Sequence, residues 1–394
     1  MERQPYSKAF FYGFLQFLFM LYYWGGLIYF PYYFKQAGVS DARIGMLISL
    51  ISLTVVVLIL PIGVLLDRIS PKIFFIVGAF IAAIFPVLFL VKSFPPWFEL
   101  YILVFGISVA LLQIAISALF LKEMGEDSRG GQTAIFSIGD ILGAGLGSEI
   151  GGIFIERFGG QGLFWMLLGF AGLLVLVGLT LPRIRGIAFH LSEYREDLKH
   201  PLTWILIFIV MIVASHAGFE YAGYTLLQTE VIGLTTSQVG RLFLYISFSM
   251  SIVTYLVGRL NDRVKQQVLL TGLALILSGI FQALSGYAQT FSQFLVIRIL
   301  HTTGDSTFFL LIYVIASLAF SKKRAGGNWA LILMIRHLSI FLFSNVAGAI
   351  NQSLGFPQGF LTSGIIMVFA GLIVTFWLRP KFREKMKAVD KFIS

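Results

Sequence analysis

The chain has 394 residues, of which 58% are hydrophobic and 12% charged, and its mean hydropathy is +0.88. Soluble domains carry roughly 25% charged residues, so this composition excludes a soluble protein and indicates one that lies in a membrane. The sequence contains no cysteine, which excludes disulfides and thiolate metal sites. The net charge of +10 is explained by lysine and arginine at the membrane surface and requires no nucleic acid.

Twelve long apolar stretches follow one another along the chain. A helix needs about 20 apolar residues to cross a hydrocarbon core of roughly 30 Å, and its backbone in lipid has to bond within the segment. The stretches cover residues 9–34, 42–66, 73–92, 97–121, 134–155, 163–182, 202–229, 239–257, 266–287, 290–320, 329–352 and 358–378. The first lacks a small-residue cleavage site, so we read it as a retained helix and not as a signal peptide. We therefore expect an all-α membrane protein with twelve transmembrane helices.

Polar and aromatic residues in the first, fourth and seventh spans are candidates for the wall of a substrate cavity. These residues are Gln16, Tyr23, Trp24, Gln113 and Tyr221. Tyrosine and tryptophan stack on sugar or base rings and also donate hydrogen bonds. The same residue types form belts at the membrane surface, which is the alternative role for the tyrosines closer to the loops.

An internal repeat relates the two halves of the chain. The sequence GVLLDR at residues 63–68, between the second and third spans, recurs as GRLNDR at 258–263, displaced by 195 residues. The same displacement relates two pairs of glycines, Gly38 with Gly233 and Gly45 with Gly240. The chain therefore reads as two copies of one unit. Since the unit itself spans the membrane, the duplication is typical of secondary transporters.

The only long polar stretch between spans, residues 183–201, divides an N-terminal six-helix bundle at 1–182 from a C-terminal six-helix bundle with a basic tail at 202–394. With alternating loops, 22 of the 29 basic residues lie on the side of the termini, five on the other side and two within spans. Because cytoplasmic loops are enriched in lysine and arginine, we expect a protein of the cell membrane with both termini in the cytoplasm. The connector is predicted to hold a short surface helix near 192–199.

The duplicated G-x-x-x-D-R motif, the two halves and the charged connector resemble the major facilitator superfamily over nearly the whole chain. The matching residues are Gly63, Asp67, Arg68 and Lys72 in the first copy and Gly258, Asp262 and Arg263 in the second; Ser70 and Pro71 replace the family's usual glycine and arginine. The resemblance implies two six-helix bundles related by a pseudo-two-fold axis, and a latch at this loop that holds the outward-open state. Asp67 can face the positive end of a helix of the other half, with Arg336 as its candidate partner. The alternative is that these are loop charges required by topology.

The fifth span contains GDILGAGLGSEIGG at Gly139–Gly152, and such a density of small residues permits close packing between helices. Drug antiporters of the superfamily carry the pattern G-x-x-x-G-P-x-x-G-G in this helix, but Ser148 stands here in place of the proline. Shifted by 196 residues, Ser148 falls on Ser344 and Asp140 on Arg336, so the eleventh span is the counterpart of the fifth. Asp140 is a candidate gating residue, with a packing role as the alternative.

The most informative ionisable residues lie in two spans of the C-terminal half. The tenth span has Arg298, His301 and Asp305 at i, i+3 and i+7, and the seventh has His216 and Glu220 at i and i+4, so each set lies on one helical face. Ionisable groups at bilayer depth are costly and mark functional paths. A histidine beside an arginine and an acid can bind and release a proton near neutral pH, so we expect this set to couple transport to protons. Two alternatives stay open: a network that pins two helices together, and an anionic substrate bound by Arg298.

These observations predict a secondary active transporter that moves a small organic solute by alternating access, through proton-coupled symport. The phrase GGLIYFPYYFKQAGVSDARIG at residues 25–45 resembles the opening of nucleoside- and oligosaccharide-type proton symporters of the superfamily. The alternative is a proton-driven exporter of drugs, siderophores or lipids. No phosphate loop, nucleophile elbow or metal-ligand spacing indicates an enzyme, and we expect no cofactor and no metal. The expected partners are the solute, protons and the lipid bilayer, without nucleic acid, and a monomer is expected to suffice.

Overall fold

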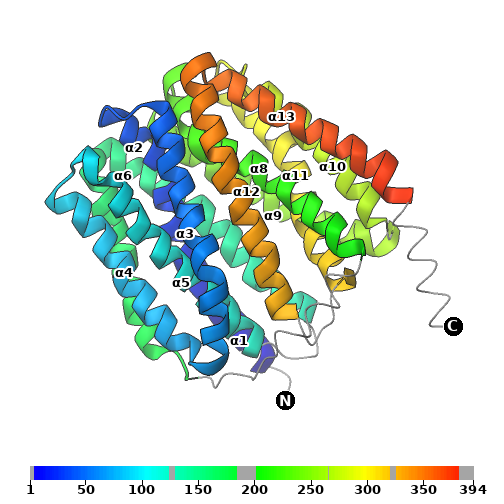
Figure 1. Cartoon of the computed structure of the whole chain (residues 1–394), viewed down its shortest axis with the longest axis horizontal. Coiled ribbons are helices and arrows are strands. Elements are labelled where there is room, and N and C mark those ends of the chain that lie inside the picture. Colours follow the sequence, from blue (N-terminus) through cyan, green and yellow to red (C-terminus); the bar gives the residue numbers. More distant parts are fainter. Residues whose placement is uncertain (1–3, 124–128, 184–200, 265, 320–324, 381–394) are drawn as a thin grey trace.

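Helices make up the regular secondary structure of the residues that the computed structural model describes, which are 4–123, 129–183, 201–264, 266–319 and 325–380 (Figure 1). The first half contains α1 (Gln4–Leu27), α2 (Phe30–Gln36), α3 (Asp41–Arg68), α4 (Pro71–Val91), a short 3-10 turn (Pro95–Trp97), α5 (Phe98–Glu123) and α6 (Arg129–Thr180). The second half contains α8 (Pro201–Leu226) with a π-helical extension (Leu227–Val231), α9 (Thr236–Val264), α10 (Gln267–Ser285), α11 (Phe291–Ala319), α12 (Ala325–Leu354) and α13 (Phe356–Leu372), which continues as a π-helix (Ile373–Leu378).

The described residues contain 11 helical stretches that are long and apolar enough to cross a membrane. The α6 stretch crosses twice, because its 52 residues would extend for about 78 Å as one straight helix, more than twice the hydrocarbon thickness. Gly159 divides α6 into two arms with a φ of 69°, a conformation that glycine adopts without strain. The described residues therefore make twelve crossings, and the predicted all-α, twelve-helix fold is confirmed.

Exposed tryptophans lie near both ends of the bundle. Trp97 and Trp165 are close to the loop before α5 and to the bend in α6, whereas Trp204 and Trp377 are close to the ends of α8 and α13 that lead to the connector and the C-terminus. Tryptophan is enriched where a protein crosses the membrane–water interface. The two pairs therefore bracket the apolar band of the molecule.

The most extensive contacts between the halves are made by α3 with α12, which lie side by side in Figure 1, and by α6 with α9. Glycines permit their closest approach. A Cβ atom at Gly45 would lie 2.8 Å from the Cα atom of Gly348, and one at Gly240 would lie 2.7 Å from the Cα atom of Glu149. These distances are shorter than a carbon–carbon contact allows, so any larger residue would push the helices apart.

The internal repeat explains why the two interfaces match. Gly348 on α12 packs against the carbonyl of Asp41 on α3, and Gly152 on α6 packs against the carbonyl of Thr236 on α9. Asp41 and Thr236 are 195 positions apart in the sequence, and Gly152 and Gly348 are 196 apart. Duplicated segments therefore make equivalent contacts on the two sides of the seam.

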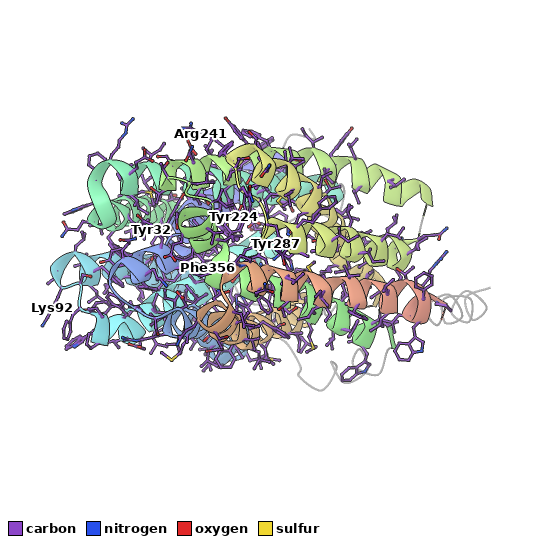
Figure 2. The ribbon with its side chains drawn as sticks, turned by 90° about the horizontal axis from the view of Figure 1, so that it is seen from above. Tyr32, Lys92, Tyr224, Arg241, Tyr287 and Phe356 are labelled. Atoms are coloured by element: carbon purple, nitrogen blue, oxygen red, sulfur yellow. The ribbon has the colours of Figure 1, made fainter. Side chains whose placement is uncertain are left out.

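Polar contacts between the halves gather near α2, at the end of the bundle away from the chain termini. Tyr29 Oη donates a hydrogen bond of 3.1 Å to the carbonyl of Thr236, and Arg241 pairs with Glu149 at 3.5 Å. Figure 2 shows Arg241 at the edge of the view and Tyr224 near its centre, where Tyr224 is buried. The halves are thus held together at this end, which we call the α2 end.

Candidate functional site

Ionisable side chains of α8 and α11 meet inside the C-terminal half. His216 and Glu220 come from α8, and Arg298, His301 and Asp305 come from α11. The side chains are at most 6% exposed, except that of Glu220, which is 16% exposed. The structure therefore brings together all five residues that the sequence selected for proton coupling. We call them the charge cluster.

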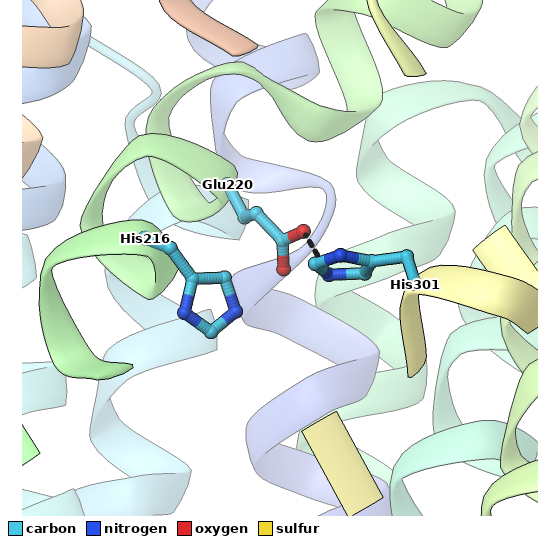
Figure 3. Close-up of side chains that lie close together, drawn as sticks. All are labelled: His216, Glu220 and His301. Carbon is cyan, nitrogen blue, oxygen red and sulfur yellow. Dashed lines mark ion pairs between the residues drawn. The ribbon is translucent and has the colours of Figure 1, made fainter. Parts of the chain in front are cut away.

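Four ion pairs connect the charge cluster. Arg298 Nη2 lies 2.6 Å from Glu220 Oε1. His301 Nε2 lies 3.0 Å from Asp305 Oδ2 and 3.4 Å from Glu220 Oε1, the pair that is dashed in Figure 3. His216 Nε2 approaches Asp305 Oδ2 at 3.6 Å. The two acids are therefore joined through the ring of His301.

A third helix, α10, completes the site with neutral side chains. Ser278 Oγ donates to Asp305 Oδ1 at 2.6 Å, and the carbonyl oxygen of Ser278 lies 2.9 Å from His301 Nδ1. One turn later, Gln282 Oε1 accepts a hydrogen bond of 2.7 Å from Arg298 Nη1. The sequence prediction missed both α10 residues because they carry no charge. Their i, i+4 spacing in an apolar helix is the one signal that could have found them.

The hydrogen bonds of His301 determine where the site can hold a proton. His301 Nδ1 lies 2.9 Å from both the carbonyl oxygen and the hydroxyl oxygen of Ser278, and since that hydroxyl donates to Asp305, Nδ1 donates to Ser278 when it carries a hydrogen. Nε2 faces carboxylate oxygens of both acids, which is favourable when Nε2 carries a hydrogen as well. Arg298 and a protonated His301 then balance the charges of Glu220 and Asp305. When the Nε2 proton is lost, the nitrogen lone pair faces two carboxylates. Protonation of His301 therefore changes the electrostatic interactions within the charge cluster.

His216, Glu220 and His301 also fit the spacing of a metal site, since each offers one ligand atom and the three atoms lie within 4.8 Å of one another (Figure 3). Zinc sites use sets of histidine and carboxylate ligands of this kind. Here Glu220 Oε1 is already paired with Arg298 at 2.6 Å, so a divalent ion would bind next to a guanidinium group. The donor set therefore suits a proton better than a metal ion.

A small cavity borders the charge cluster, and its volume of about 20 Å³ leaves room for one or two water molecules in this conformation. Its lining residues come from α1 and the turn that follows it, from α8 and from α9: Trp24, Leu27, Ile28, Glu220, Tyr221, Tyr224 and Phe243. Glu220 is the member of the charge cluster that takes part in this lining, in agreement with its greater exposure. Its carboxylate therefore links the buried cluster to the cavity.

Two of the five residues predicted to form the substrate wall line this cavity. They are Trp24 and Tyr221, whose rings meet edge to face at 5.5 Å. Tyr23 is buried among aromatic rings of α1 and α5. Gln16 hydrogen-bonds to a side chain of α6, and Gln113 is half-buried on α5. These three residues lie outside the cavity lining in this conformation.

Asp140 and Arg336, the repeat-related pair, interact electrostatically across the two halves. Gln16 Nε2 donates a hydrogen bond of 2.5 Å to Asp140 Oδ1. Arg336 also interacts electrostatically with the hydroxyl groups of Tyr23 and Tyr221. Arg336 therefore lies beside the cavity wall, where it connects α12 to helices of both halves.

The loop motifs are described only in part. Lys72 Nζ donates to the carbonyls of Leu179 at 2.9 Å and Leu181 at 2.6 Å, which ties the start of α4 to the end of α6. A Cβ atom at Gly258 would have Leu310 Cδ2, at 3.8 Å, as its nearest described neighbour, so none of the described side chains packs closely against this glycine. The side-chain surroundings of the other motif residues are not described; these residues are Gly63, Asp67, Arg68, Asp262 and Arg263. The predicted surface helix at 192–199 also lies outside the described residues. The latch stays a prediction.

Tyr224 is a further residue that the sequence prediction missed. The guanidinium group of Arg298 lies over its ring, 5.0 Å from the centroid. Tyr224 is four positions after Glu220, which is itself four after His216, so the three lie on one face of α8. That continuation of the polar face is the signal that could have identified it.

Comparison with known proteins agrees with this architecture. The Major Facilitator Superfamily model matches residues 12–277 and 203–391, which together span almost the whole chain. The chain belongs to the major facilitator superfamily. It is similar to an uncharacterized MFS-type transporter of Methanocaldococcus jannaschii (23% identity; 86% of this chain and 90% of that protein), to the MFS-type transporter SLC18B1 of Mus musculus (23%; 91% and 84%) and to the multidrug resistance protein MdtG of Escherichia coli (22%; 64% of each). Membership of this superfamily makes the chain a membrane transport protein and gives no sign of a catalytic domain.

Proposed function

We propose that the protein is a proton-coupled secondary transporter that moves a small organic solute by alternating access. The observation that carries this proposal is the position of His301, whose Nε2 lies 3.0 Å and 3.4 Å from two acids inside the bundle. One of these acids, Glu220, lines the cavity. A solute in the cavity and a proton on His301 are therefore separated by a single carboxylate.

In the proposed cycle, a proton on His301 Nε2 holds the carboxylates of Glu220 and Asp305 together and balances the charge of the cluster. Departure of the proton leaves two acids and one arginine in a low-dielectric interior, and this imbalance favours a different packing of α8 against α11. Movement of these helices is transmitted to the seams α3–α12 and α6–α9, which close the α2 end here. Proton occupancy then selects the side toward which the cavity opens.

Direction and location form part of the same proposal. Symport is the direction expected from the resemblance of residues 25–45 to nucleoside- and oligosaccharide-type symporters. Export of drugs, siderophores or lipids is the second candidate, and similarity to a multidrug resistance protein supports it. The distribution of basic residues supports a cell-membrane protein with both termini in the cytoplasm. We propose that one chain, with solute, protons and lipid as its partners, is the working unit.

The experiment that tests coupling replaces Asp305 by asparagine in protein reconstituted into vesicles. The solute is identified beforehand by a thermal-shift screen of a metabolite panel at two pH values, because binding to the native state raises the melting temperature. We expect Asp305→Asn to abolish accumulation driven by a pH gradient and to leave solute counterflow intact. Undiminished accumulation by the variant contradicts the coupling role.

The matched control is Glu99→Gln. It makes the same change from acid to amide at a pair with Arg43, which lies in the N-terminal half and outside the cluster. We expect its gradient-driven accumulation to equal that of the unmodified protein.

A further inference from the structure

Four aromatic rings surround the cavity beside Glu220. Trp24 of α1 meets Tyr221 of α8 at 5.5 Å and Phe243 of α9 at 5.1 Å between ring centroids. Phe243 in turn meets Tyr224 edge to face at 5.6 Å. The four rings therefore form a continuous wall, which we call the aromatic cage. Because α1 belongs to one half and α8 and α9 to the other, the cage is complete only when the halves are together.

Glu220 is the one charged residue among the described residues that line this cavity. Its closest contacts with Arg298 and His301 both end on Oε1. No hydrogen bond from the part of the chain that is described reaches Oε2. The cavity therefore presents aromatic faces together with one carboxylate oxygen that can accept a further partner.

The two arginines near the cavity, Arg298 and Arg336, are not among the residues that line it, and both interact with other side chains. Arg298 is 3% exposed, lies over the Tyr224 ring, donates a hydrogen bond to Gln282 and forms an ion pair with Glu220. Arg336 acts on Tyr221 from α12 and is not among the residues that line the cavity. An anionic solute would instead meet aromatic faces and a carboxylate, and both repel negative charge.

We infer that this site, once it widens during the transport cycle, binds an organic cation, namely a small quaternary or protonated amine, within the aromatic cage and against the Glu220 carboxylate. The negative face of an aromatic ring attracts a cation, and the attraction is strongest where water is excluded. The position of Arg298 over Tyr224 is the same interaction made within the protein. This inference rests on the proposed transport function in one respect, namely that the bound cation is also the solute that is transported.

The test compares three molecules of similar shape and different charge: choline, neutral 3,3-dimethyl-1-butanol and anionic 3,3-dimethylbutanoate. Binding to the purified full-length protein in detergent is measured by titration calorimetry and by tryptophan fluorescence. We expect choline to bind at least about tenfold more tightly than the neutral molecule, and the anion to bind most weakly. Equal affinities, tighter binding of the anion or no binding of choline would overturn the inference.

Two variants separate the contributions of charge and cage. Glu220→Gln removes the charge at nearly constant size, and Trp24→Leu removes one ring but leaves the charge cluster intact. Each is expected to weaken choline binding by about tenfold. Trp165→Leu is the matched control, because Trp165 is 60% exposed on α6, and choline affinity should not change.

Because Glu220 also pairs with Arg298, the melting temperature of each variant is measured first. If Glu220→Gln does not fold, Trp24→Leu decides the question, and unchanged choline affinity in that variant contradicts the cage.

Binding in detergent involves no gradient and is therefore independent of coupling. Choline binding together with solute transport that moves no protons would leave the cation site standing and refute the proposed coupling. Proton-coupled transport of a neutral or anionic solute by a protein that does not bind choline would refute the cation site and leave the coupling standing.

Discussion

The imidazole of His301 is held from two sides by different helices. The carbonyl and hydroxyl oxygens of Ser278 both lie 2.9 Å from Nδ1, and the acids Glu220 and Asp305 face Nε2. The hydroxyl of Ser278 binds Oδ1 of Asp305, which leaves Oδ2 directed toward the histidines. Ser278, a neutral residue, therefore orients both the His301 imidazole and the Asp305 carboxylate. The proposed proton is held between these two groups. Ser278 is a positioning residue, since it acts through its neighbours.

Replacing Ser278 by alanine tests this role. We expect Ser278→Ala to lower the free energy of unfolding by about 1–3 kcal/mol, because buried Asp305 Oδ1 loses its donor. We also expect the pH dependence of transport to shift, since the carboxylate that faces His301 changes its environment. Ser285→Ala is the control, because Ser285 is equally buried on α10 and bonds only to the Phe281 carbonyl of its own helix. A pH profile shared by both variants and the unmodified protein would show that Ser278 is merely structural.

At the scale of the helices, the repeat places glycines where α3 meets α12 and where α6 meets α9. Gly45 and Gly240 occupy equivalent positions, and each faces backbone of the partner helix at a distance that admits no Cβ atom. Close approach of backbones replaces the hydrophobic driving force that lipid cannot supply. The seams are therefore tight at the α2 end, and their opening exposes the cavity to that side of the membrane.

Gly45→Ala is expected to destabilise the conformation that is closed at the α2 end. The new methyl group would lie 2.8 Å from the Gly348 Cα atom, whereas in the control Gly169→Ala, on α6, it would have no atom of the described residues within 4 Å. Since the sequence has no cysteine, a single Leu27→Cys change reports on access to the cavity. We expect an impermeant maleimide, added from the side of α2, to label Leu27→Cys several-fold faster with Gly45→Ala than with Gly169→Ala. Equal labelling rates would argue against a closed seam at Gly45.

The sequence was sufficient to predict the helices and the ionisable members of the site. Charged residues at helical spacing in an apolar span, such as Arg298, His301 and Asp305, are energetically costly in lipid unless they pair with other polar groups. This cost explains why they contact Glu220. Ser278 lacks that cost and joins the cluster through tertiary packing, which spacing along a single helix does not reveal. Tyr23 lies outside the cavity lining in this conformation, and its role in a substrate wall stays a prediction, because an aromatic residue suits a cavity wall and a packed core equally well.

At the scale of the whole molecule, the charge of the cluster and the charge of the solute are linked. With a proton on His301 the cluster is balanced, and an organic cation beside Glu220 adds one positive charge to a low-dielectric site. Release of the His301 proton restores the balance. A cationic solute therefore favours exchange with protons over the symport expected from the sequence.

The central claim is that the charge cluster carries the coupling proton, and proton movement during solute uptake tests it most directly. Vesicles that contain the reconstituted protein and an internal pH-sensitive dye are mixed with the identified solute in the absence of a preset pH gradient. We predict that the internal pH changes in proportion to solute uptake, rising for exchange and falling for symport, and that His301→Asn carries no protons. Solute uptake by the unmodified protein without a pH change, or an undiminished pH change with His301→Asn, would contradict the account.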